Sequence, residues 1–438
     1  MTALYSWGRY PYRPQAPITC HWHAEVPGLL QSLRRRGADT LAFGNGRSYG
    51  DSCLARSDEV LHLRGLDRFI SADWQSGVVR AECGVTLGEL LRLTIPRGWF
   101  LPVTPGTKYV TLGGALANDV HGKNHHVRGT FGRHVRCFSL LRSDMEERIC
   151  SPETHADLFA ASIGGLGLTG VIRWVELQLV PIRGAAILQT QVRFDSLEEF
   201  FALSNELDSQ HEYTVAWVDC QARGAATGRG VFMAGDHAKG GALCAADSAK
   251  VRVPFSPPIS MMNSFTLKAF NSTYFHAHKA GRHVSRVGYE PFFYPLDRIL
   301  EWNRIYGVRG FQQYQCVIPQ TQAHDGVNAL LEAIAVEGRG SFLAVLKRCG
   351  NISSPGLLSF PQEGISLALD FPQHDAANTR LFARLDAILR EAGGRLYPAK
   401  DAHMQGSDFR RAYPAWEQVE ALRDPTMCSH FWQRVTSI

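Results

Sequence analysis

The chain has no apolar run approaching eighteen residues, and its first ten residues contain no apolar signal segment. We therefore expect neither a membrane-spanning helix nor a secretory leader. None of the ten cysteines belongs to a C-x-x-C pair, which favours reduced thiols over a disulfide framework or a zinc site. These absences predict a cytoplasmic protein whose contact with the inner membrane, where it exists, is peripheral.

Extreme charge and low-complexity composition are also absent. A formal net charge of +5 over 438 residues is mild. It is compatible with an anionic ligand or a membrane surface, and it does not predict nucleic-acid binding. With 45% hydrophobic and 20% charged residues the chain is globular, and its length predicts two domains.

Two glycine-rich segments carry most of the functional information. The first is Gly44–Asp51, and the second runs from Pro105 to His126 and contains two adjacent glycines and two threonines. Glycine lets the backbone approach a ligand closely because no Cβ intervenes, and hydroxyls and N–H groups bind anions. We interpret the two segments as two sides of one large, phosphate-bearing cofactor.

The periodicity of apolar residues divides the chain near residue 181. Before it, short strands and helices alternate as in a compact α+β domain. After it, strands at Phe311–Ile318, Ser341–Lys347 and Ile365–Phe371, interleaved with helices, predict one broad antiparallel sheet covered by helices. Residues 235–258 are loop-rich and are expected to form a mobile flap.

The string Gly165–Gly170 matches G-x-G-x-x-G. That motif indicates a dinucleotide-binding fold only when a helix follows it. Here the strand-like Val171–Val180 follows, so we reject a Rossmann site and predict a tight turn near a cofactor.

Three histidines, His121, His125 and His126, lie close together without a carboxylate or cysteine companion. Lys123 stands among them and would repel a cation, so we expect no metal. His121 suits an anion or an alkoxide, whereas a structural role stays open for His125 and His126.

Four further polar residues end or line predicted strands. Lys400 is either an ordinary surface charge or, if buried, a lysine of lowered pKa that acts as a base or a fixed charge. Gln313 and Gln315 share one strand face, where their amides bind sugar hydroxyls or simply face solvent. Lys347 ends a neighbouring strand, and its side chain is expected to point toward the same space as the two glutamines.

At these residues the chain resembles the vanillyl-alcohol-oxidase-type (PCMH-type) FAD-binding oxidoreductases, and within them the decaprenylphosphoryl-β-D-ribose 2-oxidases. The most specific matches are His121-Gly122-Lys123-Asn124-His125-His126 and Ala399-Lys400-Asp401, whereas the glycine loops mark only the superfamily. The resemblance implies a two-domain α+β flavoprotein with a bipartite FAD-binding domain and an antiparallel-sheet substrate domain. Its implied boundaries are 1–183 for the FAD-binding domain, 184–394 for the substrate-binding domain, and 395–438 for a C-terminal segment returning to the FAD domain.

The resemblance also implies a set of FAD-binding residues. They are Gly46, Arg47, Ser48, Tyr49, Gly106, Thr107, Thr111, Gly113, Gly114, Asn118, His121, Gly170 and Ile172. Many members of the superfamily tether FAD through a histidine in the first loop. This chain has Tyr49 in that region, so we expect non-covalent FAD.

The implied reaction is oxidation of the ribose C2 hydroxyl of a polyprenylphosphoryl-β-D-ribose to a ketone, with hydride passing to FAD. It is the first half of an epimerisation to the arabinose derivative, which a short-chain NAD(P)H reductase would complete. Lys400 is the first candidate for assisting loss of the hydroxyl proton and His121 the second. The implied substrate-binding residues are Lys123, Gln313, Gln315, Lys347 and Tyr397.

One departure from the family pattern concerns the strand before Asp370. The family usually carries an asparagine and a cysteine where this chain has Ser366 and Ala368. We therefore expect insensitivity to covalent inhibitors aimed at that cysteine, and the sugar contacts of this strand stay open.

The lipid tail of such a substrate needs an apolar entry. The segments Gly235–Pro258 and Met261–Tyr274 are expected to be flexible and to offer one. Phe255, Met261, Met262 and Phe265 would face the membrane, or else pack the substrate domain.

Two other functions stay open. A soluble alditol or aldonolactone oxidase of the same fold would use oxygen and a water-soluble sugar. A non-catalytic flavoprotein subunit that scaffolds a reductase would bind FAD that no sugar reduces; the presence of Lys400, His121 and both glutamines argues against it.

Overall fold

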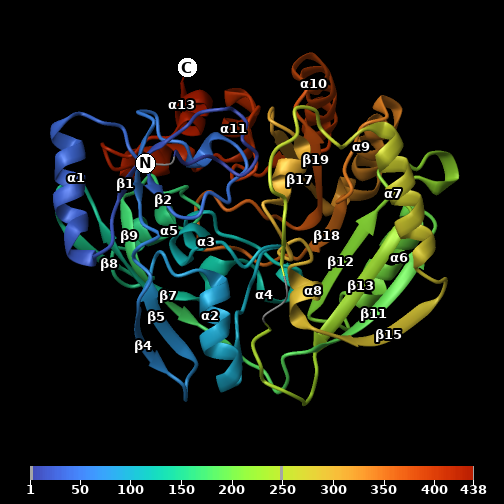
Figure 1. Ribbon diagram of the computed structural model, residues 1–438, viewed down its shortest axis with the longest axis horizontal. Helices are drawn as coiled ribbons and strands as arrows, with labels where there is room; N and C mark the ends of the chain where they lie inside the picture. The colour runs from blue at the N-terminus through green and yellow to red at the C-terminus, as the bar shows by residue number, and fades with distance from the viewer. Residues whose placement is uncertain (1–2, 247–249, 438) are drawn as a thin grey trace.

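A computed structural model of the chain describes residues 3–246 and 250–437. Two bodies of secondary structure lie side by side (Figure 1), the first built mostly from the blue to teal part of the chain and the second from the green to orange part. The architecture is the mixed α+β type expected from the sequence. Within the described residues, no helix combines the length and the apolar character that crossing a membrane requires.

The first body is built on a five-stranded antiparallel sheet in the order β4-β5-β9-β7-β8. Its strands are β4 (Phe69–Asp73), β5 (Val78–Glu82), β7 (Val135–Leu141), β8 (Glu147–Cys150) and β9 (Val171–Gln178). Three parallel strands form a second sheet, namely β1 (Ala16–Thr19), β3 (Glu59–His62) and β2 (Ala42–Phe43), and β6 (Trp99–Phe100) pairs with β10 (Val180–Pro181). The helices are α1 (Val26–Arg35), α2 (Leu87–Thr94), α3 (Leu112–Ala117), α4 (His125–Arg128) and α5 (Ala156–Ser162).

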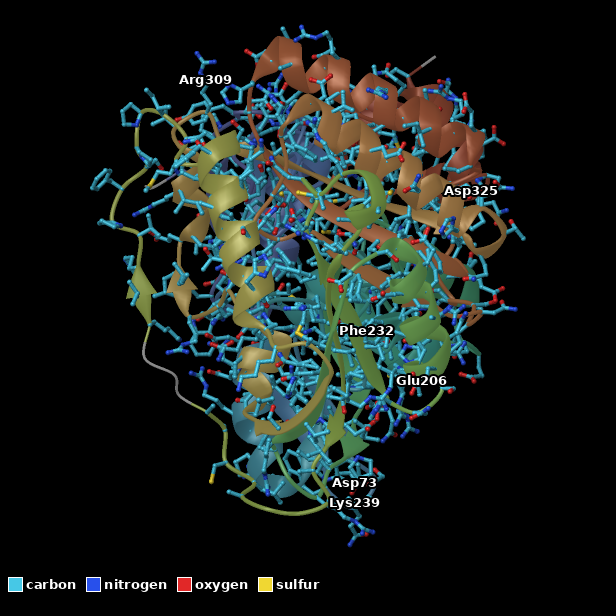
Figure 2. All side chains as sticks on the ribbon, turned by 90° about the vertical axis from the view of Figure 1, so that its right-hand side faces the viewer. Asp73, Glu206, Phe232, Lys239, Arg309 and Asp325 are labelled. Atoms are coloured by element: carbon cyan, nitrogen blue, oxygen red, sulfur yellow. The ribbon has the colours of Figure 1, made fainter. Side chains whose placement is uncertain are left out.

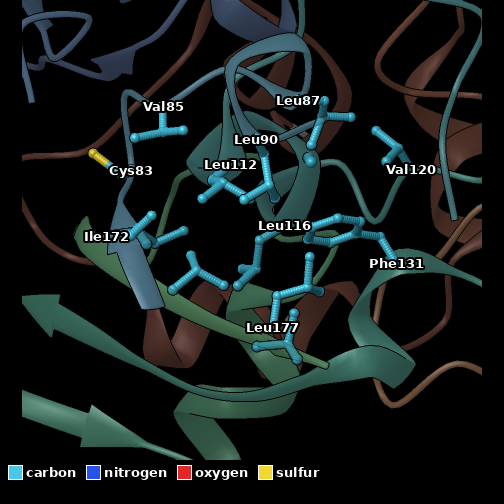
Figure 3. Packing of buried hydrophobic residues seen from close by; sticks show 14 of the residues in the cluster. Cys83, Val85, Leu87, Leu90, Leu112, Leu116, Val120, Phe131, Ile172 and Leu177 are labelled. Carbon is cyan, nitrogen blue, oxygen red and sulfur yellow. The ribbon is translucent and has the colours of Figure 1, made fainter. Parts of the chain in front are cut away.

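A closed apolar core lies beneath the second glycine-rich segment (Figure 3). Leu87 and Leu90 of α2 pack with Leu112 and Leu116 of α3 and with Phe131, and all five side chains are buried. Because α3 begins within the glycine-rich segment, this packing fixes the backbone of that segment.

The second body contains an eight-stranded sheet, antiparallel throughout, in the order β15-β11-β13-β12-β18-β19-β17-β20. Its strands are β11 (Ile187–Phe194), β12 (Tyr213–Val218), β13 (Gly230–His237), β15 (Arg282–Val287), β17 (Phe311–Pro319), β18 (Val345–Cys349), β19 (Gly364–Pro372) and β20 (Arg395–Leu396). A short parallel pair joins β14 (Val251–Arg252) to β16 (Ile299–Leu300). The sheet confirms the broad antiparallel sheet that the sequence predicted.

Helices cover the eight-stranded sheet. They are α6 (Leu197–Leu207), α7 (Ser264–Ala277), α8 (Tyr289–Phe293), α9 (Ala323–Glu337) and α10 (Asp375–Glu391). The apolar residues of α6, α9 and α10 share one core with the inward side chains of the strands. Seen from the side in Figure 2, Phe232 of β13 lies in this layer, with its ring centroid 6.0 Å from that of Phe200 on α6.

Three expectations about this second body were wrong. The strand predicted from Ser341 begins only at Val345, because Ser341 caps a turn by accepting the Leu343 N–H. Gly235 belongs to β13, so the loop starts later; residues 247–249 of the predicted flap lie outside the described residues. Most of the segment predicted to be flexible after Met261 is helix α7, which the Asn263 side chain caps through the Phe265 and Thr266 N–H groups.

The last forty residues form α11 (Gly406–Ala412), α12 (Trp416–Leu422) and α13 (His430–Thr436) after β20. They contact the first body, since the Thr40 N–H donates to Thr426 and the Arg434 guanidinium pairs with Asp51. The C-terminal segment therefore begins in the eight-stranded sheet and ends against the first glycine-rich loop.

Candidate active site

A cavity of about 680 Å³ is lined by both bodies. The first body contributes the two glycine-rich segments and the turn at Gly167–Gly170, and the second contributes side chains from β12, β13, β17, β18 and β19. The volume falls within the range of sites that enclose a cofactor or a substrate.

Every residue predicted to bind the cofactor lines this cavity. The set is Gly46, Arg47, Ser48, Tyr49, Gly106, Thr107, Thr111, Gly113, Gly114, Asn118, His121, Gly170 and Ile172. The turn at Gly165–Gly170 has φ values of 78° at Gly167 and 141° at Gly170, and β9 follows directly. The prediction of a tight turn instead of a Rossmann site is confirmed.

Contacts between the two glycine-rich segments hold their backbones together. The Asn45 amide donates to the Tyr109 carbonyl at 2.9 Å. A Cβ on Gly44 would lie 2.4 Å from Thr111 Oγ1, so only glycine allows this approach. A Cβ on Gly106 would instead meet no atom within 4 Å. The second segment therefore presents bare backbone to open space, as a cradle for a flat ligand requires.

Two buried polar atoms at this end of the cavity have no hydrogen-bond partner among the described residues. They are Arg47 Nε and Ser52 Oγ. The Arg47 guanidinium lies 4.0 Å from the Trp7 ring centroid, which fixes its direction. An arginine whose Nε has no partner, beside open backbone, is a donor set that suits the diphosphate of FAD, so the residues present fit this cofactor.

At the other end of the cavity His121 is held between two side chains. The Lys347 ammonium contacts His121 Nδ1 and donates to the Gly122 carbonyl at 2.8 Å, while the Gln315 amide nitrogen lies 3.2 Å from His121 Nε2. Burial, and then the charge of Lys347, hold the pKa of His121 well below its usual value. His121 is therefore a neutral imidazole.

In this region Lys347 is buried and Lys123 is half-buried. Burial lowers the pKa of Lys123 to about 7 and that of Lys347 to about 8. The Lys123 ammonium donates to the Phe292 carbonyl and lies 4.6 Å from the Phe292 ring centroid. Neither lysine forms an ion pair within the part of the chain that the structure describes. An anionic ligand would offset the cost of burying these two cations.

Lys400 lies just beyond β20, where the Lys400 N–H donates to the Tyr397 carbonyl at 3.0 Å. Its ammonium stands 3.6 Å from the Tyr49 ring centroid, between the first glycine-rich loop and the second body. Burial lowers the pKa of Lys400 to about 7, although the nearby Asp370 carboxylate opposes this shift. Lys400 is half-buried and lines the cavity, so of the two interpretations left open by the sequence the structure supports a lysine of lowered pKa over an ordinary surface charge.

Asp370 is a site residue that sequence reasoning used only as part of a motif. It faces Gln313 across the β17–β19 pairing and accepts a hydrogen bond of 2.7 Å from the Gln313 amide. Burial raises its pKa to about 7. The available signal was a lone carboxylate inside the mainly apolar strand Ile365–Phe371, since buried carboxylates are rare.

The Tyr397 side chain is held in place by its neighbours, and its hydroxyl already has a hydrogen-bond partner. Its hydroxyl donates to the Asn118 carbonyl at 2.8 Å, and its ring stacks on Phe360 at 4.5 Å between centroids. Ser366 and Ala368 of β19 line the cavity beside these groups. All predicted substrate-binding residues therefore line this cavity.

The other two histidines lie away from the cavity. His125 Nδ1 accepts the Gly350 N–H at 3.2 Å, and His126 Nε2 lies 3.0 Å from the His211 carbonyl. Of the two alternatives, the structure favours structural histidines. Among the described residues, no group of three or more histidine, cysteine, aspartate or glutamate side chains is arranged to hold a metal ion.

Comparisons with known proteins agree with this geometry. A family model described as an FAD binding domain matches residues 14–151. The decaprenylphosphoryl-β-D-ribose oxidase of Mycolicibacterium smegmatis is 34% identical over 438 residues, which cover 96% of this chain and 94% of that protein. A putative D-arabinono-1,4-lactone oxidase of Neurospora crassa is 29% identical over 48% of this chain and 37% of its own length. The L-gulonolactone oxidase of Mus musculus is 29% identical over 36% of this chain and 35% of its own length.

Proposed function

The chain belongs to the FAD-binding oxidoreductases of the vanillyl-alcohol-oxidase type, close to decaprenylphosphoryl-β-D-ribose oxidase, and from this premise we propose its substrate and reaction. It is an FAD-dependent enzyme. The proposed reaction oxidises the C2 hydroxyl of a polyprenylphosphoryl-β-D-ribose to a ketone. Bound FAD supplies the hydride acceptor.

The observation that carries this proposal is a set of three lysines that line the cavity together with two glutamines; Lys347 is buried, and Lys123 and Lys400 are half-buried. Lys123 and Lys347 match the negative charge of a phosphodiester. Gln313 and Gln315 offer amides to sugar hydroxyls on one strand face. A phosphorylated sugar satisfies both requirements, whereas a neutral polyol leaves the two lysines without a counter-charge.

Lys400 takes the role of base in this proposal. A pKa of about 7 leaves a large share of the lysine neutral near pH 7, and a neutral amine can accept the proton of the C2 hydroxyl. His121 then acts as a neutral group that Lys347 and Gln315 hold in place beside the sugar. FAD is bound without a covalent link, since the first glycine-rich loop presents Tyr49 instead of a histidine. We extend the proposal to a short-chain NAD(P)H reductase that reduces the keto product.

The second candidate is an aldonolactone oxidase, which the two lactone-oxidase relatives favour. Each of them matches less than half of this chain, whereas the ribose oxidase matches nearly all of it. Their similarity therefore carries less weight for the substrate end of the cavity.

The test is flavin absorbance under anaerobic conditions. Adding a polyprenylphosphoryl-β-D-ribose is expected to bleach the flavin band of the wild-type holoenzyme. Lys400→Ala is expected to keep FAD and to slow the bleaching about 10²–10⁴-fold, the usual contribution of a general base. Lys239→Ala, which removes an exposed lysine, is the matched control. Bleaching by alditols or lactones, with none by the phosphorylated ribose, would contradict the proposal.

A further inference from the structure

Residues 255–265, which we call the apolar loop, project large apolar side chains into solvent just before α7 and in its first turn. Phe255 is 67% exposed, Ile259 78%, Met261 63% and Phe265 79%. Single exposed apolar residues are ordinary, but four of them on one segment of eleven residues indicate an interaction surface.

The apolar loop is firmly attached to the protein. Met262 and the Leu267 of α7 are buried in a cluster with Trp302, so of the two alternatives left open for Met262 the structure supports packing within the protein. The Met261 N–H donates to the Ile305 carbonyl at 3.2 Å, and the Val308 N–H donates to the Pro257 carbonyl at 3.1 Å. Buried side chains and backbone hydrogen bonds therefore hold the segment in place. The exposed apolar side chains take no part in this attachment.

The stretch of sequence that contains the apolar loop carries charge of one sign, although Arg282 pairs with Glu206 at 2.6 Å and Arg304, beside the loop, pairs with Glu301 at 2.6 Å. Between residues 250 and 289 the chain has no aspartate or glutamate, and its cations are Lys250, Arg252, Lys268, Lys279, Arg282 and Arg286. Figure 2 looks onto α7 and the chain that precedes it at the edge of the molecule, with the exposed Arg309 near one end. Apolar side chains flanked by cations are typical of a surface that enters the headgroup region of an anionic bilayer.

Helix α7 connects the apolar loop to the cavity. Phe270 follows Phe265 by five residues, about 7.5 Å along the helix axis. Phe270 is solvent-exposed and also lines the cavity, together with Tyr274 and Phe342. Its ring lies 4.6 Å from that of Phe342. The cavity therefore reaches the surface beside the apolar loop.

We propose that the apolar loop and its flanking cations dock onto the surface of an anionic lipid bilayer. Docking places the cavity opening against the lipid. For the proposed substrate, and resting on that function, the polyprenyl tail then stays in the bilayer while the phosphoryl sugar enters the cavity.

Flotation of the FAD-loaded protein with lipid vesicles tests the docking without any substrate. The wild type is expected to float with vesicles of phosphatidylglycerol and phosphatidylcholine, and less with phosphatidylcholine alone. The triple variant Phe255→Ser/Ile259→Ser/Phe265→Ser is expected to lose binding by about tenfold or more, since three apolar side chains leave the lipid. Rising salt is expected to weaken binding because it screens the cations.

The control Trp22→Ser/Val336→Ser removes exposed apolar side chains that lie outside the apolar loop, next to α1 and on α9, and is expected to bind as the wild type does. Failure of the wild type to float, or equal flotation of the triple variant, would overturn the proposal.

A second arm separates docking from function. A water-soluble farnesylphosphoryl ribose is expected to reduce the flavin equally in wild type and triple variant, because none of the three residues lines the cavity. Loss of this reduction in the triple variant alone would overturn docking as the role of the loop. Absence of reduction in both proteins would count against the proposed function, and flotation would still decide the docking.

Discussion

The side chains of Lys400 and Asp370 both line the cavity, and each shifts the pKa of the other. The carboxylate raises the pKa of Lys400 against the effect of burial, and the lysine lowers that of Asp370. We expect the rate of flavin reduction to fall as the pH is lowered through about 7, because protonated Lys400 cannot accept the hydroxyl proton. A stopped-flow pH profile measures this.

We assign the fall in rate at low pH, the acidic limb of the profile, to Lys400. Replacing Asp370 by asparagine tests this assignment. The variant removes the charge that raises the pKa of Lys400, so the limb is expected to move to lower pH. Asp325→Asn, at an exposed position on α9, is the control and is expected to leave the profile unchanged. A limb that stays near pH 7 in Asp370→Asn would assign it to another group.

Ala368 lines the cavity where the family usually has a cysteine. Two other cysteines, Cys53 and Cys83, line the cavity elsewhere. Burial raises the pKa of the Cys53 thiol to about 12, so very little of it is the reactive thiolate. A covalent inhibitor aimed at the family cysteine is therefore expected not to modify the wild type and to modify Ala368→Cys. Intact-protein mass measures both, and a modified wild type would show that another thiol reacts.

Local sequence patterns identified several residues that the structure places at the cavity. Strand alternation put Gln313 and Gln315 on one face, and both line the cavity. Asp370 was not singled out because its partners come from strand pairing and from Lys400, far apart in the chain. Its significance depends on contacts that no local pattern encodes.

At the scale of elements, α13 ties the C-terminal segment to the first glycine-rich loop. The Arg434 guanidinium lies 2.8 Å from Asp51 and 2.9 Å from Asp401, the residue after Lys400. Both carboxylates are buried, so Arg434→Met is expected to lower the free energy of unfolding by about 3–5 kcal/mol. Urea unfolding of the holoenzyme measures the loss.

The matched control is Arg411→Met, which removes an exposed arginine 3.4 Å from Asp408. Exposed pairs contribute about 0–1 kcal/mol, so this variant is expected to unfold nearly as the wild type does. Equal losses in the two variants would show that burial of the Arg434 pairs does not matter.

Elements with a clear apolar period were predicted, and those without one were missed. The capped helix α2 and the hairpin of β7 and β8 appear close to their expected ends. Helix α7 buries only Leu267, Asn271 and Phe275, a narrow stripe that gives little amphipathic signal. Strand β15 is an exposed edge strand rich in arginine, and its sequence does not resemble a half-buried strand.

At the scale of the whole molecule, the residues proposed to hold FAD lie in the two glycine-rich segments, in α3 and around the turn before β9, all in the first body. The first loop offers Tyr49, and the cavity lining contains one histidine, His121, whose two ring nitrogens already contact Lys347 and Gln315. We therefore expect acid precipitation to release all FAD into the supernatant. Flavin fluorescence that stays with the precipitate would show a covalent link.

The most direct test of the account uses a polyprenylphosphoryl ribose carrying deuterium at C2, followed by anaerobic stopped-flow absorbance. If hydride leaves C2, the deuterium slows bleaching of the flavin several-fold, whereas deuterium at C3 leaves the rate unchanged. Equal rates for the C2-deuterated and unlabelled sugar in a step limited by chemistry, or an isotope effect at another carbon, would contradict C2 oxidation.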